Sequence, residues 1–213
     1  MLKKIFSTSI LLALFALVPS PAKESLDLPD RTLPLIQAVL EGAAKTIGKK
    51  AKAKEIKWEW CEGVSHYKIK WGFICLSKKE VRKLLEIGGD AAVAFLVAHE
   101  YAHHVQYSQP QLLAKHESNT NITGHNILRL ELQADCFAGV ILASIPNISF
   151  NQSDVEGVIN AAIALGDREY YHYNHHGSGE NRMLAVSSGL IYGSSKGKNK
   201  DAYYKMYCLN SEG

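Results

Sequence analysis

The chain has 213 residues, with 24 Lys or Arg and 21 Asp or Glu, so its formal charge at pH 7 is only +3. A charge this small gives no electrostatic basis for binding nucleic acid, and that class of function is excluded. The length fits one ordinary domain with a substantial core. The basic runs at residues 49–54 and 196–200 contain no aromatic residues and are interpreted as solvated linkers.

Residues 1–22 predict an export signal. Lys3 and Lys4 form a basic start, an apolar stretch follows at residues 10–18, and small residues at 20–22 suit cleavage. The apolar stretch is too short to span a membrane comfortably. We therefore expect a periplasmic or secreted domain at residues 23–213. The alternative is an uncleaved N-terminal anchor, which would place the protein at a membrane.

The next segments predict one helix and a small sheet. Apolar residues recur at three- and four-residue spacing in the segment 31–47, which is typical of an amphipathic helix that stops at Gly48. The segments 55–61 and 67–76 instead alternate in polarity, which is typical of strands. We expect these two strands to pair as a small antiparallel sheet.

All four cysteines follow the predicted signal, and an even number in an exported chain indicates two disulfides. Three pairings are possible. A bulge at Gly72 would move Cys75 onto the strand face that Cys61 occupies, which favours a bond between these two. Cys136 would then pair with Cys208.

The rest of the chain predicts helices. Residues 91–98 are eight consecutive apolar residues that continue directly into residues 99–105. This single helix should be buried, with Asp90 as a candidate N-cap. Further helices are expected at residues 127–145, 153–165 and 178–192, with Ser153 and Ser178 as candidate caps. The predicted fold class is α+β, mainly helical, with a buried helix beside a small sheet.

The buried helix carries the sequence His99-Glu100-Tyr101-Ala102-His103. Histidines four residues apart on a helix project from the same face, at a separation that one tetrahedral zinc ion can bridge. Glu100 is placed to take a proton from a water molecule at that metal. His104 points about 100° away from His103 around the helix and is interpreted as a residue that packs or supports a ligand, and not as a metal ligand itself.

A catalytic zinc site also needs a third protein ligand and one open position. Glu131 is the predicted third ligand, because it lies on a mostly apolar downstream helix. Asp135, one turn later, is predicted to accept a hydrogen bond from a ligating histidine and so to orient its ring. The alternative is that this carboxylate pair merely decorates an exposed face.

His176 precedes a predicted helix in a His-Gly-Ser stretch. It is a candidate catalytic donor to the oxyanion of a tetrahedral intermediate, although the stretch could equally serve only as a turn and cap. Less specific candidates for that role are Tyr170, Tyr171 and Tyr173. The remaining isolated histidines, interpreted as surface residues, are His66, His116, His125 and His172.

Three segments together resemble the bacterial neutral zinc metallopeptidases, zincins with a glutamate third ligand. They are the histidine motif at residues 99–106, the sequence Glu-Leu-Gln-Ala-Asp-Cys-Phe-Ala-Gly at 131–139, and Ala-Leu-Gly-Asp at 164–167 followed by His-Gly-Ser at 176–178 and Arg182. The resemblance implies zinc on His99, His103 and Glu131, with Glu100 catalytic. It also implies a cysteine-flanked segment ahead of the ligand helix, to which Cys61 and Cys75 correspond.

These observations predict a peptidase that uses one zinc ion per chain and acts on a peptide or protein substrate, which we expect to pair with the edge of the strand at residues 67–76. Two alternatives remain open. The site could serve a non-catalytic protein that binds zinc or peptide, although binding alone requires no base such as Glu100. It could also belong to a zinc hydrolase of amide or ester bonds outside proteins.

Overall fold

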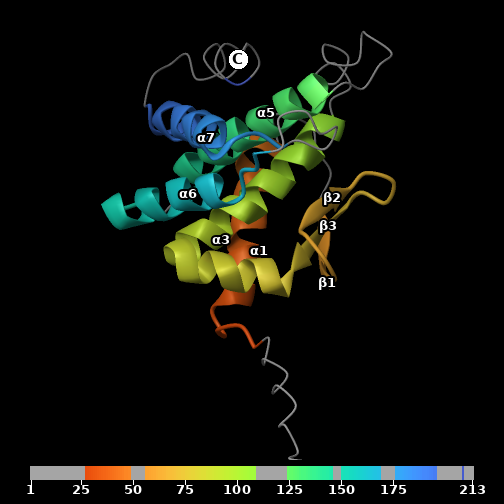
Figure 1. Ribbon diagram of the computed structural model, residues 1–213. Helices are drawn as coiled ribbons and strands as arrows, with labels where there is room; N and C mark the ends of the chain where they lie inside the picture. Colours follow the sequence, from red (N-terminus) through yellow and green to blue (C-terminus); the bar gives the residue numbers. More distant parts are fainter. Residues whose placement is uncertain are drawn as a thin grey trace, which may run out of the picture.

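The computed structural model describes residues 27–48, 56–108, 124–145, 150–168, 176–195 and 208. The described chain is mainly helical, with one three-stranded sheet beside the helices (Figure 1). The predicted signal at residues 1–22 and both basic runs lie outside the described residues. No helix in the described ranges has the length and apolar character needed to cross a membrane.

Helix α1 (Thr32–Ala43) continues into a π-helical turn, η1 (Ala44–Gly48), as the apolar periodicity predicts. One side of it is buried in the core by Ile36, Val39 and Leu40. At its start Arg31 donates from Nε to both carboxylate oxygens of Asp90, each at 2.9 Å. The predicted cap residue Asp90 thus ties the start of α1 to the helix that carries the histidines.

The sheet differs from the prediction, because it has three strands and is mixed. Its order is β1 (Lys57–Cys61), β3 (Phe73–Ser77), β2 (His66–Lys68), with β1 parallel and β2 antiparallel to β3. The expected single strand at residues 67–76 is interrupted by a turn, in which Gly72 has a φ of 67° and its N–H donates to the carbonyl of Lys68 at 2.8 Å. That turn folds β2 back onto β3 and leaves the other side of β3 for β1.

The predicted reversal of side-chain parity at Gly72 is confirmed, although a turn rather than a bulge produces it. Ile74 and Leu76 are fully buried, whereas Cys75 lies on the opposite face and forms a disulfide with Cys61. The second disulfide joins Cys136 to Cys208, as expected. Two disulfides are typical of proteins in an extracellular or periplasmic environment.

Helix α3 (Lys78–Ser108) consists of two helical parts that meet at a kink. Gly88 and Gly89 have non-helical backbone angles there, and Gly89 has a φ of 63°. The main chain of Gly88 also lies against that of Gly157, where a Cβ would come within 2.6 Å of the Gly157 Cα. Every residue from Ala91 to Ala98 is buried, which confirms the predicted core helix.

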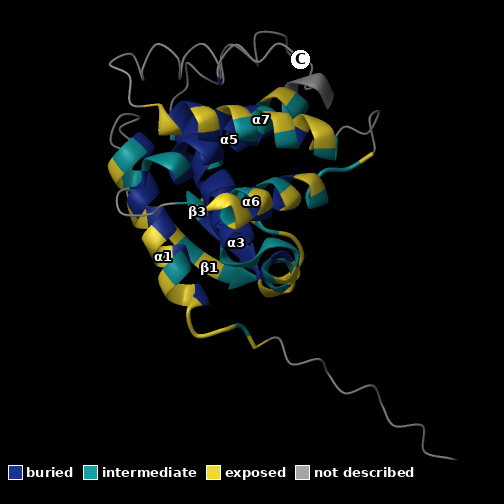
Figure 2. Ribbon diagram, turned by 90° about the vertical axis from the view of Figure 1, so that its left-hand side faces the viewer, coloured by how far each residue is buried: buried dark blue, intermediate teal, exposed yellow. Residues whose placement is uncertain are grey.

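Helices α5 (Gly124–Ser144) and α6 (Gln152–Ala164) pack on α3, and α7 (Gly179–Ser194) packs on α5 and α6 (Figures 1 and 2). The side chain of Ser178 caps α7, as predicted, by accepting from the Asn181 N–H at 3.2 Å. The predicted cap of α6 was wrong by two residues. Asn151 caps it instead, because it exchanges hydrogen bonds with Asp154 in a capping box that Ser153 does not form.

Helices α5 and α7 approach each other through their backbones. A Cβ on Gly139 would lie 2.7 Å from the Leu190 nitrogen and would collide with the carbonyl oxygen of Val186, while a Cβ on Gly189 would collide with the carbonyl oxygen of Cys136. Only glycine at these positions permits so short a separation. As a result, side chains from α7 can reach into the interior beside α5.

Candidate metal centre

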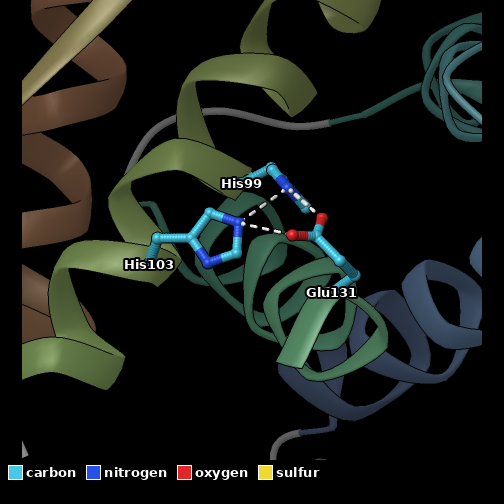
Figure 3. Close-up of side chains that lie close together, drawn as sticks. All are labelled: His99, His103 and Glu131. Carbon is cyan, nitrogen blue, oxygen red and sulfur yellow. Dashed lines mark hydrogen bonds and ion pairs between the residues drawn. The ribbon is translucent and has the colours of Figure 1, made fainter. Parts of the chain in front are cut away.

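The two motif histidines project from the same face of α3 (Figure 3). Their Nε2 atoms lie 3.1 Å apart, and the rings are nearly perpendicular. Only 5% of the His99 side chain and 14% of the His103 side chain are exposed. Two ring nitrogens this close, in a site largely shielded from water, need a proton or a metal cation between them.

Glu131 extends from α5 toward the same point (Figure 3). Its Oε2 lies 3.2 Å from His99 Nε2 and its Oε1 lies 3.5 Å from His103 Nε2. Among the described residues, His99, His103 and Glu131 are the one group of three or more metal-binding side chains close enough to hold an ion. The predicted ligand residues, which are 32 positions apart at their extremes, are therefore brought together by the packing of α5 against α3.

The spacing of the three atoms fits zinc. With zinc–ligand distances of about 2.0–2.2 Å, a tetrahedral ion holds its ligand atoms roughly 3.3–3.6 Å apart. The observed separations of 3.1, 3.2 and 3.5 Å are close to that range. Two imidazoles and one carboxylate leave one of four positions open, which is the ligand set of a catalytic rather than a structural zinc site.

The charges of the site are strongly coupled. Burial disfavours the imidazolium of His99, but the Asp135 carboxylate, together with hydrogen bonds to Asp135 and Glu131, outweighs it and raises the pKa of His99 to about 10. Burial would raise the pKa of Glu131, but His103, His99 and His176 hold it well below its ordinary value. The metal-free site thus holds a proton on His99 next to an ionised Glu131.

Asp135 occupies the position that the sequence predicted for it. Its Oδ1 lies 2.8 Å from His99 Nδ1 and accepts a hydrogen bond from that nitrogen. This bond leaves His99 Nε2 as the nitrogen that faces Glu131 and His103. Asp135 is fully buried, and the nearby Arg182 and His99 outweigh its burial and lower its pKa.

Arg182 is a residue whose role the sequence did not reveal. It comes from α7 and is buried, and it binds Asp135 through two hydrogen bonds of 2.8 Å. Its third group, Nη1, donates to the main-chain carbonyl of Leu165 at 3.0 Å. The guanidinium therefore neutralises and orients the carboxylate that orients His99.

Glu100 lies one residue beyond the first histidine and is only 4% exposed. Its Oε2 is buried without a hydrogen-bond partner among the described residues. Burial raises the pKa of this carboxyl, while the charges of His99 and His103 partly oppose that shift. A buried carboxylate oxygen without a partner is costly unless a water or substrate group completes its hydrogen bonding.

His176 precedes α7 and contacts the centre through Glu131 of α5. Its Nδ1 lies 3.3 Å from Glu131 Oε2, and 53% of its side chain is exposed. Its main-chain N–H donates to Asp167 at 2.8 Å, and Gly177 has a φ of 101°. The hydrogen bond to Glu131 raises the pKa of His176.

The other candidates lie away from the metal centre or outside the described residues. His104 is buried, and its Nδ1 lies 3.2 Å from the Tyr67 hydroxyl of β2, as expected of a packing residue. His66 is exposed, as predicted. No side-chain description covers His116, His125, His172 or the three tyrosines at 170, 171 and 173. The expected substrate edge was wrong in part, because β3 is the central strand and only β2 of that segment lies at an edge.

A mainly helical domain with a buried two-histidine, one-glutamate centre places the protein in the zincin-like class. The family described as "Putative neutral zinc metallopeptidase" matches residues 75–197, and the chain belongs to this family. The match includes both ligand helices, Arg182 and His176.

Two relatives illustrate the similarity. "Uncharacterized protein YpfJ" of Escherichia coli (strain K12) is 36% identical over 93 residues, which are 41% of this chain and 32% of the relative. "Uncharacterized protein Rv2575" of Mycobacterium tuberculosis is 34% identical over 91 residues, 38% of this chain and 31% of the relative. The matched segment thus spans about a third of the length of these relatives. No solved structure matches the chain.

Proposed function

We propose that the protein is a zinc-dependent peptidase that hydrolyses peptide bonds with Glu100 as its general base. The observation that carries the proposal is the buried Glu100 oxygen without a partner, beside three side chains spaced for one zinc ion. Membership of a zinc metallopeptidase family supports the same class of reaction. A centre that only stored or bound zinc would have no use for this buried carboxylate.

One zinc ion per chain would be held by His99, His103 and Glu131, and when bound it would supply Lewis acidity that polarises a substrate carbonyl and acidifies a water molecule. Glu100 accepts the proton that the attacking water loses. Because burial raises the pKa of Glu100, its carboxylate is more basic than an exposed one and retains the proton until the leaving amide nitrogen takes it.

His176 is proposed as a donor to the oxyanion that forms during the attack. Its Nδ1 faces Glu131, so Nε2 is the ring nitrogen available for a substrate oxygen. The raised pKa of His176 favours the imidazolium form, in which both nitrogens donate. The half-exposed ring lies where a substrate could reach it.

The proposed substrate is a peptide or protein outside the cytoplasm. The two disulfides support an extracellular or periplasmic location. Our interpretation of residues 1–22 as an export signal, with the catalytic domain at 23–213, agrees with that location. The export signal is tested by determining the N-terminus of the mature protein after expression in cells that export it, and we expect that N-terminus at residue 23.

The proposal is tested with Glu100→Gln, which keeps the shape of the side chain and removes the base. Zinc content and fold should match those of the wild type, while turnover of a mixed peptide library should fall by about 10²- to 10⁴-fold. Glu131→Ala should lose zinc under competition with a chelator. Glu156→Gln, on the exposed face of α6, is the matched control and should behave as the wild type.

Three outcomes would contradict the proposal. Unchanged turnover in Glu100→Gln would remove Glu100 from the reaction. A zinc-loaded wild type that cleaves nothing in the library but retains peptides would favour the binding-protein alternative. Hydrolysis of simple esters or non-peptide amides, without peptide cleavage, would favour the alternative of a zinc hydrolase that acts on bonds outside proteins.

A further inference from the structure

Gln106 lies on α3 one turn beyond His103 and is fully buried. Its amide contacts three groups. Its Oε1 lies 2.8 Å from His103 Nδ1, while its Nε2 lies 2.8 Å from the carbonyl oxygen of Leu130 and 2.9 Å from Gln133 Oε1. The amide therefore bridges a predicted zinc ligand on α3 and the main chain of α5.

The chemistry of these partners fixes the orientation of the amide. A main-chain carbonyl can only accept a hydrogen bond, so the NH₂ group of Gln106 must face Leu130. Its oxygen then faces His103, where it can only accept. A neutral His103 must consequently carry its proton on Nδ1, which leaves the lone pair of Nε2 directed toward His99 and Glu131.

The two histidines are thus oriented by different groups. His99 donates to the charged Asp135, whereas His103 donates to a neutral amide. Three carboxylates, those of Glu100, Glu131 and Asp135, are already buried at the centre. An amide at position 106 orients His103 without adding a fourth buried negative charge, which would be costly.

We propose that Gln106 is a positioning residue, which holds His103 in the tautomer that can bind zinc and ties its ring to α5 at Leu130, the residue before the ligand Glu131. The inference rests on the proposed zinc site. A glutamine that merely filled its own hydrogen bonds in the core would have no effect on the tautomer of His103. A positioning residue instead keeps the proton of neutral His103 on Nδ1.

Gln106→Met tests the inference, because methionine has a similar size but accepts no strong hydrogen bond. Without an acceptor at Nδ1, the proton of His103 should move to Nε2, where Glu131 Oε1 lies 3.5 Å away and can accept it. Nitrogen-15 NMR of the imidazoles in the metal-free full chain distinguishes a protonated Nδ1 from a protonated Nε2 and reports this tautomer directly. Zinc affinity, measured by competition with a chelator, should fall about 10- to 100-fold.

Gln133→Met is the matched control. Gln133 is only 2% exposed and belongs to the same hydrogen-bonded group, but its bond is to Gln106 and not to His103. Its substitution should leave the His103 tautomer unchanged and zinc affinity close to that of the wild type. Gln106→Glu is the second variant, since a carboxylate keeps an acceptor for His103 and should preserve the Nδ1–H tautomer.

The wild type alone can overturn the inference, because a neutral His103 with its proton on Nε2 contradicts it whatever the variants do. An unchanged tautomer and zinc affinity in a folded Gln106→Met would also overturn it. If Gln106→Met does not fold, loss of the Nδ1–H tautomer in Gln106→Glu would overturn the inference. Failure of the wild type to bind zinc would instead refute the proposed function, and the tautomer measurement would remain interpretable without metal.

Discussion

Replacement of Arg182 by Met should strongly destabilise the metal-free protein. The change removes two 2.8 Å hydrogen bonds to Asp135 and leaves that carboxylate buried, with no exposed surface, and without its guanidinium partner. Breaking a buried ion pair by removal of one partner costs about 3–5 kcal/mol. For a domain of this size, that corresponds to a fall in Tm of roughly 6–20 °C.

The assay is urea unfolding of zinc-free protein with intact disulfides, followed by tryptophan fluorescence. Arg31→Met is the matched control, because Arg31 makes a similar two-bond pair with Asp90 but both side chains are exposed, by 63% and 43%. An exposed pair contributes about 0–1 kcal/mol, so the control should remain near the wild type. A loss below about 1 kcal/mol in Arg182→Met would refute the buried-pair argument.

The double variant Asp135→Asn/Arg182→Met separates the excess buried charge from lost packing. It should be more stable than Arg182→Met by about 1–3 kcal/mol, because it removes the excess negative charge that loss of the guanidinium leaves beside His99. A double variant no more stable than the single one would contradict this.

The pKa of Asp135 is lowered from 3.8, so its stabilisation is present above pH 3.8 and is lost as the pH falls toward the folded-state pKa. The difference between wild type and Arg182→Met should narrow accordingly in acid.

Two further predictions concern the metal and the disulfides. Because the pKa of His99 is raised from 6.5 to about 10, zinc must displace the proton of His99 at neutral pH. Zinc affinity should therefore fall as the pH falls, and calorimetry in two buffers should detect about one proton released per zinc. Zinc binding without proton release would contradict this prediction. In metal-free protein the same shift contributes stability below pH 6.5 that is lost as the pH rises through about 10. The disulfide Cys136–Cys208 closes a loop of 72 residues and Cys61–Cys75 one of 14, so the longer loop should restrict the unfolded chain more. Replacing Cys136 and Cys208 by serine should therefore lower the free energy of unfolding in urea by about 1.5 kcal/mol more than replacing Cys61 and Cys75. Equal losses of stability would contradict this reasoning.

The helices and the metal-binding pair could be predicted from the sequence because their signals are local. The eight apolar residues at 91–98 lead directly into His99 and His103, and the length of this segment and the four-residue spacing of the histidines together indicate one buried helix with both histidines on a common face. Glu131 was predictable from an unusual property, a carboxylate on a mostly apolar helix. The predicted parity of Cys75 also depended only on neighbouring residues.

The sheet and the outer hydrogen bonds were harder to predict. Strand pairing depends on which edges meet in three dimensions, so nothing local indicates that β1 pairs parallel to β3. Arg182 is 47 positions from Asp135, and its spacing carries no signal of their contact. Gln106 could have been found, because it lies three residues after His103 on the same helix and therefore on a neighbouring face.

The backbone contact between α5 and α7 has a consequence for engineering and for the divergence of relatives. Side-chain contacts can adapt to a substitution by changing rotamers, but the contacts at Gly139 and Gly189 involve main-chain atoms and cannot. A chimera that took α5 from one relative and α7 from another would inherit an interhelical distance that neither helix sets alone. Because α7 delivers Arg182 to Asp135 on α5, the two helices should be exchanged between relatives only as a pair.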